Sequence, residues 1–296
     1  DNPALADAVE VTLPVAEPVI LKKESVAGTT GNTSFAVREV APGAWEQARG
    51  TFRFAISSTP WLTKLMGLPF LLEYPHGCFE QKSTKLLACT YLANLLEYLP
   101  DVEARKANYE KVILETLGEF ESALLPDGRL PYWPGGTEPN DYVTVQAAWC
   151  VTQAEAAGFP VPEHLSSGLF TSLETISTNA QSSPTLRAFA LFVLSTFEWE
   201  STDEIVATAN ELFLQRDKLT GEGLAMLAIA LNRLEIEPEK QRQLVNELPK
   251  DFGNIGFNPA IFSSATRTEA LCLWAQMLIL PNADHTVLNE RLGHLM

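Results

Sequence analysis

Apolar residues recur at intervals of three and four from about residue 58 onward, the spacing of helices that bury one face. Capping residues followed by proline mark several expected helix starts, including Thr59-Pro60, Ser183-Pro184 and Glu237-Pro238. We predict about ten helices in this part, joined by short loops, and no strand. Such a chain must pack helix against helix, so the predicted fold class is mainly α.

The expected helix starts form a weak internal repeat. Thr144, Thr185, Thr220 and Thr268 each open a helical stretch, with small residues in the first turns and large apolar residues after them. They recur at intervals of roughly 35 to 50 residues, the range of helical-hairpin repeats. Small residues let helices approach closely, so such hairpins can stack into an open solenoid or close into a ring. Ordinary buried helix starts would give the same pattern, and spacing alone does not separate these interpretations.

Residues 1–57 have a different pattern. They are rich in Val, Thr and Pro, and residues 8–15 and 50–56 alternate at period two, as strands with one buried face do. About four short strands make a poor domain on their own. We therefore expect part of a β-module that is completed elsewhere, and we place the domains at 1–57 and 58–296.

Composition and charge exclude several function classes. The chain has 37 acidic and 21 basic residues, a net charge of −16, which repels nucleic acid and anionic lipid. No apolar run in the sequence is long enough to span a membrane, and no signal peptide is visible at its start. The four histidines and four cysteines are scattered, and no Gly-rich phosphate loop is present. We therefore expect no metal and no cofactor.

One segment, YPHGCFEQ from Tyr74 to Gln81, carries residues suited to covalent chemistry. Its proline and glycine indicate a turn, which places Cys78 at a helix start, where free N–H groups and the helix dipole favour a thiolate. Gln81 lies three residues later and faces the same side. A thiolate beside that carboxamide carbon could expel ammonia and form an internal thioester between Cys78 and Gln81. Glu80 is a candidate for the accompanying proton transfer.

A plainer interpretation competes with this one. A cysteine at a helix start is more often a small buried hydrophobe, and a glutamine three residues on also occurs by chance. Cys89, Cys150 and Cys272 lie in apolar helical stretches, and we interpret them as core residues. Cys78 and Cys89 are too far apart along one helix to pair, whereas a Cys150–Cys272 disulfide stays open.

The segment resembles the thioester signature of the alpha-2-macroglobulin and complement superfamily, Pro-Tyr-Gly-Cys-x-Glu-Gln. Five residues match, and His76 stands where the family usually has tyrosine. GRLPYWPGG at 128–136 and DYVTVQAAW at 141–149 are similar to the loop and helix that follow in bacterial members. The similarity extends over the whole chain and is most specific over residues 71–150. The matching residues of the signature are Pro75, Gly77, Cys78, Glu80 and Gln81.

The resemblance implies an α/α toroid of helical hairpins for 58–296, truncated at its C-terminal end. It implies a partial CUB-like or macroglobulin-like β-sandwich region for 1–57. The implied function is stoichiometric covalent protease trapping rather than enzymatic turnover, with protease lysine amines bound through Gln81 as Cys78 leaves. Some neighbours are expected either to shield the thioester or to be ordinary core residues: Tyr74, His76, Phe79, Tyr132, Trp133 and Tyr142.

The resemblance also bears on partners, location and selectivity. The parent protein is expected to have further domains and to be periplasmic, extracellular or in the cell envelope, with a lipid anchor as one option. Complement-type members use a downstream histidine to favour hydroxyls. His164 looks like part of a helix start, and His285 and His294 lie near the C-terminus, so we expect that histidine to be absent and amines to be preferred.

Three alternative functions stay open. One is an α/α-toroid enzyme, which would need paired or clustered acids facing a cavity, whereas the acidic pairs here lie at helix ends. Another is a helical-repeat binding module whose thioester has been lost. The third is an adhesin that uses the same bond to attach to a surface.

Overall fold

The computed structural model describes residues 77–93, 102–197, 203–253, 255 and 261–280. The chain divides into two units, Asp1–Thr63 and Lys64–Met296, and all of these residues belong to the second. The strands predicted for residues 1–57 and the helix start at Thr59-Pro60 lie outside the described residues. The domain boundary at residue 57 therefore stays a prediction.

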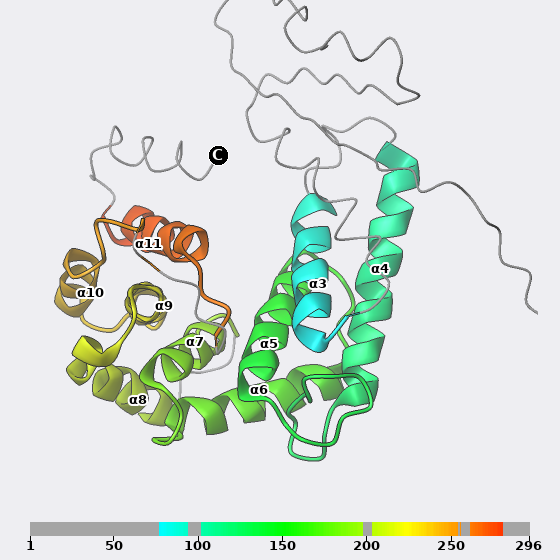
Figure 1. Ribbon diagram of the computed structural model, residues 1–296, viewed down its shortest axis with the longest axis horizontal. Coiled ribbons are helices and arrows are strands. Elements are labelled where there is room, and N and C mark those ends of the chain that lie inside the picture. The colour runs from blue at the N-terminus through cyan, green and yellow to red at the C-terminus, as the bar shows by residue number, and fades with distance from the viewer. Residues whose placement is uncertain (1–76, 94–101, 198–202, 254, 256–260, 281–296) are drawn as a thin grey trace, which may run out of the picture. The chain divides into compact units, whose positions relative to one another are not determined.

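The described residues are mainly helical, as the sequence predicts (Figure 1). An isolated β-bridge joins Pro131 to Pro139. In chain order the helices are α3 (Phe79–Ala93), α4 (Val102–Ala123), α5 (Asp141–Ala156), α6 (Glu163–Thr178), α7 (Pro184–Leu194), α8 (Asp203–Leu214), the short 3-10 helix η6 (Arg216–Lys218), α9 (Gly221–Arg233), α10 (Pro238–Asn246) and α11 (Ala265–Ile279).

The helices alternate between two rows. In the first row, α3, α5, α7, α9 and α11 pack each against the next. In the second row, α4, α6, α8 and α10 each pack against two successive helices of the first row, as α10 does against α9 and α11. Figure 1 shows α9 with α7, α10 and α11 around it. This two-layered order of hairpins is the arrangement that the sequence repeat and the resemblance predict.

The four threonines of the sequence repeat belong to four helices of the first row. Thr144, Thr185 and Thr268 lie within the first four residues of α5, α7 and α11, and Thr220 immediately precedes α9. Each of these helices begins with a side chain that accepts a backbone N–H, whereas α6 and α10 begin without one. The capping residues are Asn140, Ser183, Thr220 and Ser264.

Small residues at these starts bring neighbouring helices together. The backbone N–H of Thr220 donates to Thr185 Oγ1 at 3.1 Å. A Cβ on Gly223 would lie 3.0 Å from Thr185 Oγ1, and one on Gly221 would lie 3.3 Å from Thr268 Cγ2. The start of α9 therefore contacts the starts of both α7 and α11, which explains the small residues in the repeat.

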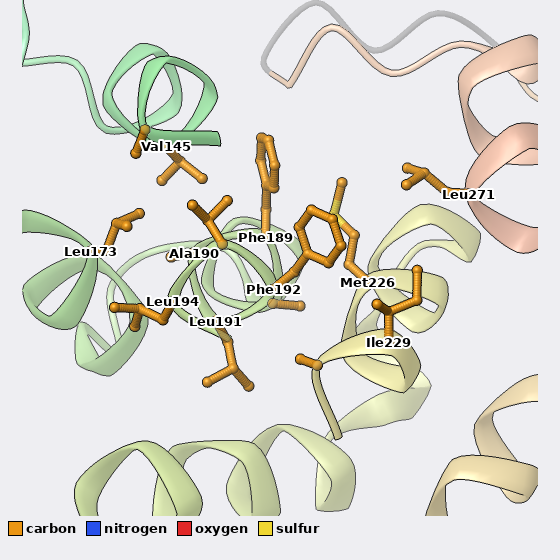
Figure 2. Close-up of a cluster of buried hydrophobic side chains, with 14 of the residues drawn as sticks. Val145, Leu173, Phe189, Ala190, Leu191, Phe192, Leu194, Met226, Ile229 and Leu271 are labelled. Atoms are coloured by element: carbon orange, nitrogen blue, oxygen red, sulfur yellow. The ribbon is translucent and has the colours of Figure 1, made fainter. Parts of the chain in front are cut away.

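Helix α7 lies at the centre of the core. Its sequence, PTLRAFALFVL, is apolar apart from Thr185 and Arg187, as expected of a helix that is surrounded. Figure 2 shows Phe189 and Phe192 of α7 among side chains of other helices, including Met226 of α9 and Leu271 of α11. Each large side chain fully buried in this way contributes about 1.5–3 kcal/mol of transfer free energy.

The charged residue of α7 is fully paired. Arg187 is only 3% exposed. Its Nε donates to the carbonyl of Ser177 at 2.7 Å, and its two Nη atoms donate to the carboxylate of Glu211 at 3.0 and 2.9 Å. The guanidinium thereby connects α6, α7 and α8, and these hydrogen bonds hold the pKa of Glu211 below its ordinary value.

Candidate functional site

Cys78 and Gln81 lie together at the start of α3. The carbonyl of Cys78 accepts the first hydrogen bond of the helix, from the N–H of Lys82 at 3.0 Å. The N–H of Cys78 donates to Gln81 Oε1 at 3.1 Å. The carboxamide of Gln81 therefore folds back toward the cysteine, as the spacing of three residues predicts. Cys78 is buried, at 2% exposure, whereas Gln81 is exposed, so the pair has its sulfur inside and its acyl group at the surface.

The hydrogen bond from Cys78 to Gln81 has two physical consequences. A nucleophile that attacks Gln81 Cδ places negative charge on Oε1, and an N–H donor already in position stabilises that charge. The same bond is also half of a capping box, in which the third residue of a helix reaches back to the N-cap. The geometry thus suits both acyl chemistry and simple capping.

The loop between α4 and α5 reaches the cysteine through Tyr132. The N–H of Phe79 donates to the carbonyl of Tyr132 at 3.0 Å. Burial, followed by the interaction with Cys78, raises the pKa of Tyr132 to about 12. The main chain of Tyr132 is therefore bound to the residue that follows Cys78.

Gly128 fixes the same loop against α6. Its φ is +79°, and a Cβ at this position would lie 2.3 Å from the carbonyl oxygen of Gly168 and 2.8 Å from Ser172 Oγ. Ser172 Oγ also donates to the carbonyl of Asp127 at 3.1 Å. Only glycine fits this approach of loop to helix.

A pocket of about 530 Å³ opens beside Tyr132. At its rim, Arg129 donates from Nη1 to Asp141 Oδ1 at 2.8 Å and from Nε to Asp127 Oδ2 at 3.0 Å. The hydrogen bonds from Arg129 lower the pKa of Asp127. The pocket is lined by Arg129, Tyr132, Pro139, Asn140, Asp141, Tyr142, Leu186 and Phe262.

Comparison with known proteins gives a match in structure alone, since no family model and no curated protein matches the sequence. Native alpha-2-macroglobulin from Escherichia coli, spanning domain MG7 to the C-terminus, superposes with a TM-score of 0.61 and 17% identity, over 76% of this chain and 37% of that one. The chain shares its fold with part of the bacterial alpha-2-macroglobulins.

Two further alpha-2-macroglobulin structures agree with this result. Salmonella alpha-2-macroglobulin reacted with methylamine gives a TM-score of 0.61 and 20% identity, over 78% of this chain and 16% of that one. Trypsin-activated alpha-2-macroglobulin from E. coli gives 0.60 and 17%, over 75% and 16%. This chain therefore spans only a small part of these macroglobulins.

The structure distributes the predicted shield residues unevenly. The main chain of Tyr132 is bound to Phe79, the residue after Cys78. Phe79 itself is buried and packs edge-on against Phe120 of α4, with ring centroids 5.6 Å apart. Tyr142 is buried and lines the pocket together with Tyr132. Trp133 is 59% exposed and touches the ring of Tyr132 at a centroid distance of 5.5 Å. The other two predicted residues, Tyr74 and His76, lie outside the described residues.

The side chain of Glu80 is bound to its own helix and not to Cys78. Its carboxylate accepts from Thr84 Oγ1 at 3.2 Å, one turn further along α3. Its negative charge contributes to raising the pKa of Tyr132, after burial and the interaction with Cys78. Proton transfer by Glu80 stays a prediction.

Sequence reasoning missed a buried polar group at the wall of the pocket. The hydroxyl of Tyr142 accepts from Arg267 Nη1 at 2.9 Å, and Arg267 Nη2 lies 2.8 Å from Glu222 Oε1. Glu222 is 2% exposed, and burial raises its pKa. Glu222 and Arg267 lie in the first turns of α9 and α11, close to the repeat threonines Thr220 and Thr268. A charged residue beside each of these threonines was the sequence pattern that could have indicated the buried pair.

The remaining cysteines occupy the core, as predicted. Cys78, Cys89, Cys150 and Cys272 are all buried and none of them forms a disulfide, so the Cys150–Cys272 disulfide left open by the sequence is not formed. Burial raises the pKa of Cys89 to about 12 and also raises that of Cys150.

Metal ligands, membrane spans and histidines add little to the site. In the part of the chain that the structure describes, no cluster of His, Cys, Asp and Glu could hold a metal ion. No helix within those same ranges combines the length and the apolar character needed to cross a membrane. His164 lies exposed in the first turn of α6, the predicted helix start, and His285 and His294 lie outside the described residues.

Proposed function

We propose that this chain is the thioester domain of a bacterial alpha-2-macroglobulin-like inhibitor of endopeptidases, and that it traps proteases covalently. The observation that carries the proposal is the carboxamide of Gln81, held at 3.1 Å by the N–H of Cys78 at the mouth of a buried thiol. The fold shared with bacterial alpha-2-macroglobulins and the signature around Cys78 support it.

Bond formation would use the residues already in contact. The Cys78 sulfur attacks Gln81 Cδ and the carbon–nitrogen bond breaks. The amide nitrogen, which already carries two hydrogens, takes the thiol proton and leaves as ammonia. Glu80 is the proposed proton carrier, since it lies between Cys78 and Gln81 in the sequence. The N–H of Cys78 stabilises the charge that develops on Gln81 Oε1.

Capture would reverse the role of the sulfur. An unprotonated lysine amine attacks Gln81 Cδ, the carbon–sulfur bond breaks, and its electron pair stays on Cys78. The products are an amide that joins the protease to Gln81 and a free Cys78 thiol, so each molecule reacts once. A thiolate leaves more readily than an amide nitrogen, which makes the thioester the reactive form and the amide the stable one.

The solved neighbours support this partner class. One is a Salmonella protein reacted with methylamine, and others are E. coli proteins activated by trypsin and by porcine elastase. We therefore propose attacking proteases as partners, through their lysine amines, with further domains in the parent protein and a periplasmic, extracellular or cell-envelope location.

Intact-mass measurement of the full 296-residue chain tests the bond directly. A thioester removes one ammonia from the calculated mass. The deficit should be absent in a Cys78→Ala variant and present in a Cys89→Ala variant, the matched control on the same helix. A wild-type chain of full mass, or a deficit that survives Cys78→Ala, would refute the assignment.

Methylamine provides a second, functional test. It should add to the wild-type chain at Gln81 and release one additional titratable thiol, and the Cys89→Ala variant should behave likewise. The Cys78→Ala variant should incorporate no methylamine at Gln81, which peptide mass mapping would show. Equal incorporation by Cys78→Ala and wild type would exclude a thioester.

A further inference from the structure

We propose that Lys85 is an internal acceptor for the acyl group of Gln81, so that a thioester which meets no protease becomes an isopeptide bond between these two side chains. The inference rests on the proposed function, because the Gln81 carbon acylates an amine only once a thiolate has replaced its nitrogen as the leaving group. It assigns a modification site to Lys85 and gives the unused thioester a fate other than capture or hydrolysis.

Gln81 and Lys85 lie one turn apart on α3. Residues four apart on a helix are surface neighbours, with about 5–6 Å between their Cβ atoms. Gln81 is exposed and Lys85 is partly exposed, so both side chains lie at the surface of the helix. The preceding pair with the same spacing already meets, since Thr84 Oγ1 donates to Glu80 Oε1 at 3.2 Å. The spacing therefore places the Lys85 side chain next to the acyl group of Gln81.

The direction of the side chains brings the two reacting atoms within reach. Helical side chains incline toward the N-terminus of the helix, so that of Lys85 inclines toward the turn that carries Gln81. The carboxamide of Gln81 lies at the N-terminal end of α3, where Oε1 accepts from the N–H of Cys78 at 3.1 Å. The lysine amine lies at the end of a flexible four-carbon stem, which together with the glutamine side chain spans the distance between the two Cβ atoms.

Other nucleophilic side chains near Gln81 are already bound to partners. The ammonium group of Lys82 pairs with Glu119 of α4, and positions one apart on a helix do not face each other. Ser83 is buried, and its hydroxyl donates to the carbonyl of Phe79 at 2.7 Å. Among the described residues, Lys85 has no hydrogen-bond or ion-pair partner to hold it away from Gln81. Lys85 is thus the neighbouring amine with freedom to move to the acyl carbon.

The step balances without any further reagent. The unprotonated Lys85 amine bonds to Gln81 Cδ, the carbon–sulfur bond breaks, and Cys78 keeps the electron pair. One proton passes from the nitrogen to the sulfur through solvent, and the N–H of Cys78 stabilises the charge on Gln81 Oε1 during the attack. No atom is gained or lost, so the isopeptide form has the same mass as the thioester but one more free thiol.

The experiment follows the purified full chain during incubation at mildly alkaline pH without added amine. Intact mass reports the ammonia deficit, alkylation in urea counts free thiols among the four cysteines, and methylamine incorporation reports the remaining thioester. Lys85→Arg keeps the positive charge and removes the nucleophile, because a guanidinium stays protonated. Lys82→Arg is the matched control, because it makes the same change at the lysine that pairs with Glu119.

We expect wild type and Lys82→Arg to lose methylamine incorporation while they keep the mass deficit and gain a fourth alkylated cysteine. Peptide mapping should then join the peptide that contains Gln81 to the one that contains Lys85. Lys85→Arg should lose its methylamine incorporation at least about tenfold more slowly, since it lacks the intramolecular amine, and should regain mass through hydrolysis.

Each other outcome overturns one identified statement. Loss of the thioester at the same rate in wild type and Lys85→Arg, with water gained in both, would overturn the isopeptide bond and leave the thioester standing. A Lys85→Arg chain that keeps the deficit and gains the fourth thiol would overturn the choice of Lys85. A freshly purified wild-type chain without the mass deficit would overturn the proposed function itself.

Discussion

Replacing Gly128 by alanine should destabilise the domain more than any other glycine substitution in the same loop. A left-handed φ of +79° costs a residue with a Cβ about 1–2 kcal/mol. The added Cβ would also lie 2.3 Å from the carbonyl oxygen of Gly168, so the loop and α6 would have to separate by several tenths of an ångström. Forced repacking of this kind costs about 1–3 kcal/mol. We therefore expect a total loss of about 2–5 kcal/mol in the free energy of unfolding.

Gly135 provides the control for this prediction. It lies in the same loop, its φ is +77°, and a Cβ there would meet nothing within 4 Å. Gly135→Ala should cost only the backbone term, about 1–2 kcal/mol. Urea denaturation followed by circular dichroism measures both variants, and their difference isolates the contact with α6. Equal losses in the two variants would refute the close approach of Gly128 to Gly168.

Three other predictions concern the packing of the two rows. Glu211→Ala should lower the free energy of unfolding by about 1–3 kcal/mol at neutral pH, because buried Arg187 loses its partner. Arg187 depresses the pKa of Glu211. The stabilisation from this pair is therefore complete above the ordinary carboxyl pKa and is lost as the pH falls through the pKa of Glu211 in the folded chain. Urea titrations should show the stability of the variant approaching that of wild type in acid, and a difference that stays constant with pH would contradict this. Gly223→Val should cost about 1–3 kcal/mol of stability by crowding Thr185. Gly118→Ala in α4, where the added Cβ meets nothing, should instead stabilise the chain by about 0.5–1 kcal/mol. If thermal unfolding finds the Gly223→Val variant as stable as the Gly118→Ala variant, the contact between α7 and α9 is refuted. Cys89 and Cys150 should react with a thiol reagent only after denaturation, since burial raises both pKa values, and rapid labelling of either in the native chain would be the opposite result.

The features predictable from sequence are those fixed by short-range spacing. A capping residue and its helix start lie within four residues, so Ser183-Pro184 and Thr220 could be assigned to helix starts without knowing the fold. The contact between Cys78 and Gln81 is local for the same reason. Repeat length was compatible with the two-row order, because recurring hairpins can bury their apolar faces against their neighbours, but the resemblance was needed to prefer it over ordinary buried helix starts.

The features that could not be predicted depend on pairs distant in sequence. Arg267 binds the hydroxyl of Tyr142 across 125 residues, and no local pattern records that pairing. The exposure of Trp133, at 59%, was equally hidden, because an aromatic residue in a Gly-rich loop has no periodicity from which to infer its side. Tyr132 and Trp133 therefore looked alike in the sequence, and only the fold shows that the main chain of Tyr132 is bound to the start of α3.

The alternation of the two rows has a consequence for how the domain loosens. Because each helix packs mainly against its neighbours in the order of the rows, α11 and α10 share no main packing contact with α3. Local opening at the α11 end can then spread through α9 one helix at a time, with a free energy that rises at each step. Native-state hydrogen exchange would map this as a gradient of protection. The start of α3, next to Cys78, would then stay folded while α11 opens locally.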